Sequence, residues 1–430
     1  MTSEYLKQPI DPTSADLLAA SGLRFGVLDS SSPTDFAEWS QAVSRGFVGT
    51  RDTPEQVEQL RGYFSDRRSV GVWDDSAADA ASPVATVASW QAALSVPGQK
   101  SVDVWAISDV TVAPTHRRRG IATQLLESEL RTARALGLPL AALTVSESTI
   151  YGRFGFAPAA QARSLTINTR RARWTGPIAP GRVQFVTSEQ LLSDGHALIE
   201  RVRLDAPGQI QYVGLLWERQ LGALIGDEKT KGLRFVRYDD EDGAPQGFAI
   251  YRIEETEPDF VSHELKLLYL VTATDDAYAA LWRFVLEHDL VSTVTASLRP
   301  LDEPVRWMIS DFRAVTTSDI DHLWTRILDV PAALEARSYF APGRVVIEVN
   351  DRLGFAAGRW ALEVSTGGAA TVVPTTDDAT VTMDVNELAA IYLGGVAPGV
   401  LRRAGRIAGE TAVLDGMFVS PVAPWLSIWF

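Results

Sequence analysis

The sequence predicts a mixed α/β (α+β) protein made of three successive regions. At roughly 150 residues per domain, a chain of 430 residues corresponds to about three domains. Residues 1–165 and 182–310 both alternate helix-like and strand-like segments, and the pattern changes after about Ala314. A run of turn formers at 175–181 is typical of a linker between the first two regions.

The composition is that of a globular chain. It is 46% hydrophobic and 22% charged, and it contains no run of about 18 apolar residues that would predict a membrane span. The absence of cysteine excludes disulfides, thiol nucleophiles and thiolate metal ligands. The first residues lack the basic and apolar stretches of a signal peptide, so we expect a cytoplasmic protein.

The acidic balance bears on possible partners. A net charge of −14 disfavours nucleic acid and favours cationic ligands through long-range attraction. Solubility alone explains such a charge equally well. A preference for a cationic ligand therefore needs local evidence.

Regular elements are predicted in the second and third regions. In the second, the hydrophobic pattern indicates strands at 248–253 and 265–271 and a helix at 275–288. In the third we expect three strands and two helices, at 344–350, 359–364, 380–385, 386–393 and 400–408. The first two regions have a similar texture, which hints at a duplicated domain.

A change of side-chain parity marks the strand that contains Trp105. Trp105 and Ile107 share one parity, whereas Val110 and Val112 share the other. A regular strand would therefore turn its apolar face over midway. A β-bulge would absorb this change. Alternatively both faces of the strand are covered, and the parity has no meaning.

A basic loop with a glycine follows this strand. The run Arg117-Arg118-Arg119-Gly120 leads into an amphipathic helix over 121–136, and 140–145 is then expected to form a strand. A helix N-terminus suits a phosphate group, and glycine lets a ligand approach the backbone. Three adjacent arginines are also common in solvated turns. The strand–loop–helix–strand order favours a phosphate site, with Ser146 at the strand end where α/β sheets place ligands.

Two motifs in this block resemble those of the GNAT acetyltransferases. Arg117-x-x-Gly120-x-Ala122 matches their pyrophosphate loop, and Tyr151-x-x-x-Gly155-Phe156 looks like their tyrosine element after the fifth strand. In that fold a bulged, splayed strand exposes its backbone to the pantetheine arm. The resemblance implies acetyl-CoA as co-substrate, held by Val110, Thr111, Val112, Arg117, Arg118, Arg119, Gly120, Ile121, Ala122, Thr123, Ser146 and Glu147.

The whole chain is similar to a narrower group, the Eis (enhanced intracellular survival) acetyltransferases of actinobacteria. Residues 110–120, 150–156 and 328–337 and the terminal Phe430 carry this resemblance. It implies homohexamers, and a chain of three domains: a GNAT domain with the acetyl-CoA site at 1–165, a degenerate GNAT-like domain without an arginine–glycine loop at 175–312, and a sterol-carrier-like (SCP2-like) domain at 315–430.

Attack of a neutral amine on a thioester benefits from a proton donor for the thiolate and a base for the amine. Tyr151, with a reference pKa of about 10, is a credible general acid, and a packed tyrosine is the alternative. None of the five histidines has a recognisable catalytic spacing. The apolar chain end either forms an edge strand with a surface carboxylate or brings that carboxylate to a place where it has a use. By the Eis resemblance, the main-chain carboxylate of Phe430 is the general base.

The same resemblance implies an acceptor amine on a polycationic small molecule, with aminoglycosides expected. Asp35, Trp39 and Trp105 are candidates for lining its pocket. The alternatives are a protein lysine acetyltransferase and a non-catalytic lipid- or acyl-CoA-binding protein. The sequence lacks the motifs of nucleotide hydrolysis, serine hydrolysis and zinc proteolysis, and we expect no metal.

Overall fold

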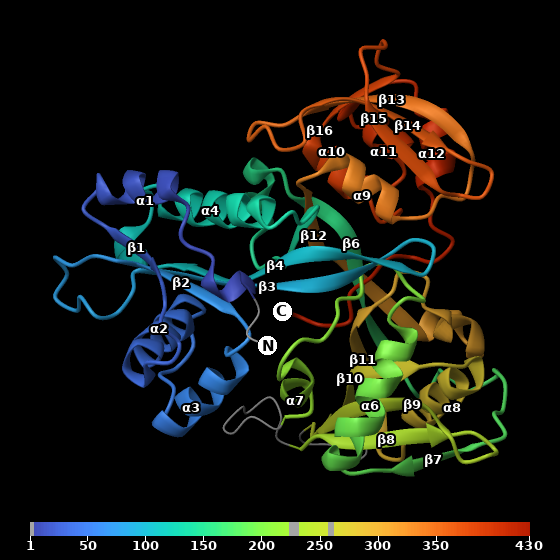
Figure 1. Ribbon diagram of the computed structural model, residues 1–430. Coiled ribbons are helices and arrows are strands. Elements are labelled where there is room, and N and C mark those ends of the chain that lie inside the picture. Colours follow the sequence, from blue (N-terminus) through green and yellow to red (C-terminus); the bar gives the residue numbers. More distant parts are fainter. Residues whose placement is uncertain (1–3, 223–231, 257–261) are drawn as a thin grey trace.

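The computed structural model describes residues 4–222, 232–256 and 262–430. In this part of the chain the strands form a twelve-stranded sheet and a separate five-stranded sheet (Figure 1). The large sheet has the order β1-β2-β3-β4-β5-β12-β6-β11-β10-β9-β8-β7, and the small sheet has the order β15-β14-β13-β16-β17.

The first half of the large sheet comes from the first region of the chain. Its strands are β1 (Arg24–Val27), β2 (Arg68–Trp73), β3 (Ala85–Val96), β4 (Lys100–Val112), β5 (Leu140–Thr144) and β6 (Ala157–Asn168). Its helices are α1 (Pro12–Ala19), α2 (Pro33–Gly46), α3 (Pro54–Tyr63), α4 (Ile121–Ala135) and α5 (Ser148–Tyr151). Strands β4 and β5 are parallel, and α4 is the crossover between them.

The second half repeats this plan. Its strands are β7 (Arg182–Phe185), β8 (Arg234–Asp239), β9 (Pro245–Glu254), β10 (His263–Thr272), β11 (Val291–Arg299) and β12 (Val315–Ile327). Its helices include α6 (Ser188–Val202), α7 (Leu216–Gln220) and α8 (Asp275–Leu286). Here β10 and β11 are the parallel pair, and α8 is their crossover.

The two halves are joined by an exchange of their last strands. Strand β6 follows β5 in the chain but pairs with β11, and β12 follows β11 but pairs with β5. Between them β6 and β12 pair with each other, antiparallel, near the centre of the molecule (Figure 1). Each half therefore completes the sheet of the other.

The C-terminal domain packs against this central pair of strands. It contains β13 (Gly343–Asn350), β14 (Gly358–Val364), β15 (Ala370–Pro374), β16 (Val381–Asp384), β17 (Ile407–Gly409), α9 (Val330–Ala336), α10 (Val385–Ile391), α11 (Pro398–Arg403) and α12 (Ala412–Phe418). Helix α10 packs on both β6 and β12. The predicted domain boundaries stay predictions, but the pairing of β12 favours a C-terminal domain that starts after residue 327.

Most predicted elements are present, with one correction. The predicted helix 400–408 is wrong at its end: α11 stops at Arg403, and β17 instead pairs antiparallel with β16. Gly405, at φ +73°, turns the chain between them. Of the two possibilities left open for the chain end, the edge strand is absent, because residues 419–430 form neither helix nor strand.

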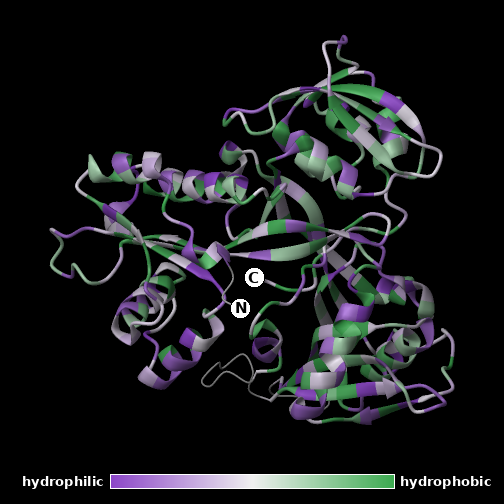
Figure 2. Ribbon diagram, viewed as in Figure 1, coloured by the Kyte–Doolittle hydropathy of each residue, from purple (hydrophilic) through white to green (hydrophobic). Residues whose placement is uncertain are grey.

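Burial follows the amphipathic patterns. On α4 the apolar side chains of Ile121, Leu125, Leu126 and Leu130 are buried, as the spacing predicts. Figure 2 shows both hydrophobic and hydrophilic residues on the helices that flank the sheets. None of the helices in the described segments is long and apolar enough to cross a membrane.

Candidate active site

The parallel strands β4 and β5 separate at the point where the cofactor was predicted to bind. Their last paired residues are Ala106 and Ala142, although β4 runs on to Val112. Opposite β3, the stretch from Ser108 to Thr111 carries one residue more than its partner strand, and Asp109 has φ +54°. The predicted β-bulge is therefore confirmed. Within the described residues, the splayed end of β4 has no strand partner on the β5 side.

The loop after β4 has a conformation suited to an anion. Arg118 and Gly120 both adopt positive φ, of +62° and +78°. Gly120 is the N-cap of α4, and within the described chain no side chain caps the amides of the first helical turn. Those uncapped amides and the helix dipole attract a negative group. Arg117 and Arg118 are exposed and form no ion pair with the described residues, so both are free for a diphosphate.

A network beside the loop fixes its far side. Asp74 accepts a hydrogen bond from Ser76 at 2.5 Å and lies 3.0 Å from Nε2 of His116. These bonds lower the pKa of Asp74 to about 2, so its carboxylate stays charged near neutral pH. Arg119 lies 3.7 Å from the same carboxylate, which draws this arginine towards β2. Of the three arginines, Arg119 thus has a structural partner already.

Tyr151 lies on the turn that follows β5. Its side chain is buried, and burial, with the charge of Glu147, raises its pKa to about 12. The hydroxyl therefore keeps its proton across the neutral range. Ser146 and Glu147 are exposed just before this turn.

Strand β12 and the C-terminal domain together hold the tyrosine turn in place. Asn386 Nδ2 donates hydrogen bonds to the carbonyls of Gly152 and Phe156, each at 2.8 Å. Arg326 Nε donates to the carbonyl of Phe154 at 2.7 Å, and the Arg326 guanidinium is itself paired with Asp351 at 2.7 Å. The position of Tyr151 thus depends on residues far along the chain.

The chain end lies at the same place. The main-chain oxygen of Phe430 accepts a hydrogen bond from Thr144 Oγ1 at 2.7 Å, at the last residue of β5. The Phe430 ring packs edge-on against Trp90 of β3, with ring centroids 5.6 Å apart. His322 Nε2 donates to the carbonyl of Ile428 at 2.8 Å, and burial lowers the pKa of His322 to about 4. A neutral imidazole therefore holds the tail two residues before its end.

A group of charged residues that was not predicted lies beside Trp90, the tryptophan that packs against the Phe430 ring. The Arg67 guanidinium stacks on Trp90 at 3.9 Å from the ring centroid and forms an ion pair with Asp109 at 4.0 Å. Burial raises the pKa of the Asp109 carboxyl, and the charges of Arg67 and Arg219 oppose this rise. The parity change in the sequence falls on Asp109 itself, and this was the one signal that marked it.

The three predicted pocket residues do not form a pocket. Trp39 and Trp105 are fully buried core residues. Their indole N–H groups donate to the Val70 carbonyl at 2.9 Å and to Glu129 at 3.0 Å. Asp35 is exposed in the first turn of α2. The prediction is therefore wrong for both tryptophans, because each is already occupied in the core.

The corresponding site in the second half is built differently. Strands β10 and β11 last pair at Leu267 and Ala296, and β10 has a register shift directly afterwards. The helix that follows, α8, is N-capped by the Thr274 side chain and carries Asp275 and Asp276 in its first turn. A capped N-terminus with two carboxylates repels a diphosphate. The second half therefore keeps the splayed strands without an anion site.

This fold and loop define the chain as a GNAT-type N-acetyltransferase, and family models agree. The acetyltransferase (GNAT) domain matches residues 28–159 and again 208–327. The sterol carrier protein domain matches residues 330–427. Among the described residues, no group of three or more His, Asp or Glu side chains is placed to hold a metal ion.

Similar proteins narrow the family. An uncharacterised N-acetyltransferase of Streptomyces avermitilis is 34% identical over 90% of this chain and 95% of its own. N-acetyltransferase Eis of Mycobacterium tuberculosis is 34% identical over 76% of this chain and 81% of its own. The crystal structure of Eis1 from Mycobacterium abscessus has a TM-score of 0.78 at 28% identity and covers 95% of this chain and 100% of that one. The chain belongs to the Eis-like family of GNAT N-acetyltransferases.

Proposed function

We propose that this acetyltransferase moves the acetyl group of acetyl-CoA directly to an amine of a polycationic small molecule, with aminoglycosides as the expected class. Arg117, Arg118 and the amides of Ile121, Ala122 and Thr123 hold the diphosphate. The splayed end of β4, with Val110, Thr111 and Val112, faces the pantetheine arm. Gly120, Ser146 and Glu147 complete the surroundings of the cofactor, and Arg119 contributes charge from its place beside Asp74.

The chain end supplies the base in this proposal. The observation that carries it is the hydrogen bond of the Phe430 main-chain oxygen to Thr144, at the end of β5 and shortly before Tyr151. A carboxylate there takes the proton that the acceptor amine must lose before or during attack. The N–C bond then forms as the C–S bond of the thioester breaks.

Tyr151 supplies the acid. A hydroxyl with a pKa of about 12 is a weaker acid than a thiol with a reference pKa of about 8.5. Complete transfer to a free thiolate would therefore be uphill. The raised pKa favours a hydrogen bond that the hydroxyl donates to sulfur as negative charge develops there. The proton that the amine loses balances the proton that the thiolate finally takes up.

The local charges are compatible with a cationic acceptor but do not require one. Asp66 and Asp109 add two carboxylates beside Arg67, and burial raises the pKa of each. Arg67 and Arg219 balance them. The net charge of −14 gives long-range attraction for a polycation. A cytoplasmic location, a hexameric assembly and a reaction without metal stay predictions.

A panel assay tests the acceptor class. Consumption of the acetyl-CoA thioester is measured with aminoglycosides, polyamines and lysine-containing peptides at equal amine concentration. We expect the aminoglycosides to be acetylated fastest. Faster turnover of lysine peptides would favour a protein lysine acetyltransferase. Cofactor binding with no turnover of any amine would favour a non-catalytic acyl-CoA-binding protein, against the family membership.

A further inference from the structure

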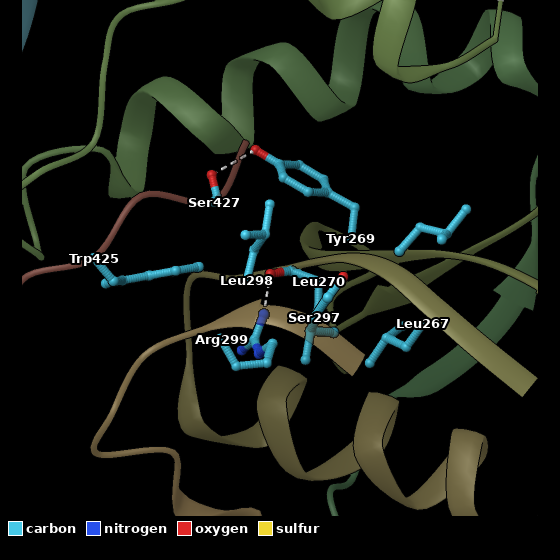
Figure 3. Close-up of a pocket in the computed structure, with 9 residues that line it drawn as sticks. Leu267, Tyr269, Leu270, Ser297, Leu298, Arg299, Trp425 and Ser427 are labelled. Atoms are coloured by element: carbon cyan, nitrogen blue, oxygen red, sulfur yellow. Dashed lines mark hydrogen bonds between the residues drawn. The ribbon is translucent and has the colours of Figure 1, made fainter. Parts of the chain in front are cut away.

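The splayed end of the second parallel pair is occupied by the tail of the same chain. A pocket lies where β10 and β11 part, lined by residues of both strands, among them Tyr269 and Arg299, and by Trp425 and Ser427 of the tail (Figure 3). In Figure 3 the tail runs past the strand ends, with the Ser427 hydroxyl facing Tyr269. Its place corresponds to the one proposed for the pantetheine arm in the first half.

The tail is recognised by both its backbone and its side chains. The Trp425 amide donates to the Pro207 carbonyl, and Gln209 Nε2 donates to the Trp425 carbonyl, each at 2.9 Å. The Ser427 hydroxyl lies 2.8 Å from Gln209 Oε1 and 3.2 Å from the Tyr269 hydroxyl. These are the contacts of a peptide-binding site.

The walls of this site are held by contacts that do not involve the tail. Arg299, which stacks over the Trp425 ring at 5.3 Å, is held by Glu303 at 2.8 Å. The Tyr269 hydroxyl is also hydrogen-bonded to Tyr212, and both tyrosines are buried. Burial of preset groups lowers the entropic cost of holding a peptide.

The loop that carries Gln209 is anchored to the first half. The Gly208 amide donates to the Ser95 carbonyl at 2.9 Å, and the Gln209 amide donates to Ser95 Oγ at 2.8 Å. Gly208 has φ +97°, and a Cβ there would lie 2.8 Å from the Trp425 carbonyl oxygen. The loop that binds the tail is therefore fixed relative to β3. Trp90 of the same strand packs against the Phe430 ring.

The stretch of chain from Ser427 to the chain end is short. Three residues separate Ser427 from the end of Phe430, and an extended chain advances about 3.3 Å per residue. Ser427 therefore lies within about 10 Å of chain from the terminal carboxylate, so its contacts help to position that end.

We propose that the second GNAT-like half is a peptide-binding module whose ligand is residues 425–427 of its own chain, and that Gln209 and Tyr269 are positioning residues for the terminal carboxylate. The part of this proposal that concerns catalysis rests on the proposed role of Phe430 as base. The module itself stands on the contacts of the tail alone.

The test compares Gln209→Ala with Gln211→Ala in the full-length protein. Gln211 is exposed two residues along the same loop, so it is a matched control. Removing two neutral hydrogen bonds should favour the undocked tail roughly tenfold. Amides of residues 423–428 should then exchange hydrogen about tenfold faster in Gln209→Ala than in the control. The KM for acetyl-CoA should stay unchanged and kcat should fall.

The two readouts separate the two claims. Equal tail exchange in Gln209→Ala and Gln211→Ala would overturn the peptide-binding module. Faster exchange with unchanged kcat would keep the module and refute the role of Gln209 as a positioning residue for the carboxylate. Ser427→Ala, which changes the tail instead of the loop, repeats the measurement if Gln209→Ala does not fold, and the same outcomes apply.

Discussion

The two splayed strand pairs, β4–β5 and β10–β11, show how one backbone arrangement serves two purposes. Both pairs part beside an irregular strand, and both are followed by a helix that begins at the opening. The difference lies in the helix N-termini. One begins at an uncapped Gly120 after three arginines, and the other begins at Thr274 with two aspartates. The two helix N-termini thus differ in charge and capping, in line with our proposal that one opening binds the cofactor and the other binds the tail.

Of the changes predicted below, extension of the chain end should lower kcat the most. Two glycines added after Phe430 move the carboxylate away from Thr144 while the loop that binds the diphosphate stays intact. We expect kcat to fall roughly 100- to 10,000-fold, the range for loss of general acid–base catalysis. Thioester consumption at saturating acetyl-CoA measures it.

Phe430→Leu is the control for this extension. It keeps the carboxylate and removes only the ring contact with Trp90, so it should lose far less activity. An extended protein that acetylates as fast as its parent would place the base elsewhere.

Tyr151→Phe should have the next largest effect. It removes the proton donor and leaves the loop unchanged, so kcat should fall about 100-fold with little change in the KM for acetyl-CoA. Because the pKa of Tyr151 is about 12, its hydroxyl should cause no alkaline fall of kcat below about pH 11. An alkaline limb near neutral pH that disappears in Tyr151→Phe would contradict this environment.

Charge changes at the two helix N-termini should separate the two halves. Arg118→Ala removes a free cation from the cofactor loop and should raise the KM for acetyl-CoA about tenfold, the size of a charge-assisted hydrogen bond. Asp275→Ala, at the matching place on α8, should leave this KM unchanged. Equal effects of the two substitutions would remove the functional difference between the halves.

The last prediction concerns stability instead of rate, and it involves the histidine that holds the tail. Since the folded protein binds the His322 proton at a pKa of about 4 and the unfolded chain at about 6.5, protonation favours unfolding as pH falls. His322 should therefore contribute a loss of about 2 kcal/mol in the free energy of unfolding between pH 7.5 and pH 5.

Urea denaturation of the parent and of His322→Gln at both pH values isolates the contribution of His322 to the free energy of unfolding. Glutamine keeps a donor for the Ile428 carbonyl but does not titrate. The same pH dependence in both proteins would show that His322 does not titrate with a lowered pKa.

The part of the site that the sequence predicts is the part that is local. The bulge, the arginine loop, α4 and the tyrosine turn all lie between residues 105 and 156, where strand parity and helix spacing constrain them directly. Of the chain end, the sequence shows only its apolar character. Its place beside Thr144 follows from tertiary contacts, and its proposed role as base comes from the Eis resemblance alone.

Other features depend on pairing between distant segments. Nothing local in β6 or β12 indicates that they exchange partners, since each is an ordinary strand. Strand β17 is only three residues long and is defined by its pairing with β16. Trp39 and Trp105 suggested a pocket because their buried partners, Val70 and Glu129, lie far away in sequence.

The number of acetyl-CoA molecules bound per chain tests the contrast between the two halves most directly. Calorimetric titration of the full-length protein should give one site per chain, weakened in Arg118→Ala and unchanged in Asp275→Ala. Two sites per chain, or a single site that is insensitive to Arg118 and altered by Asp275, would contradict the assignment of one opening to the cofactor and the other to the tail.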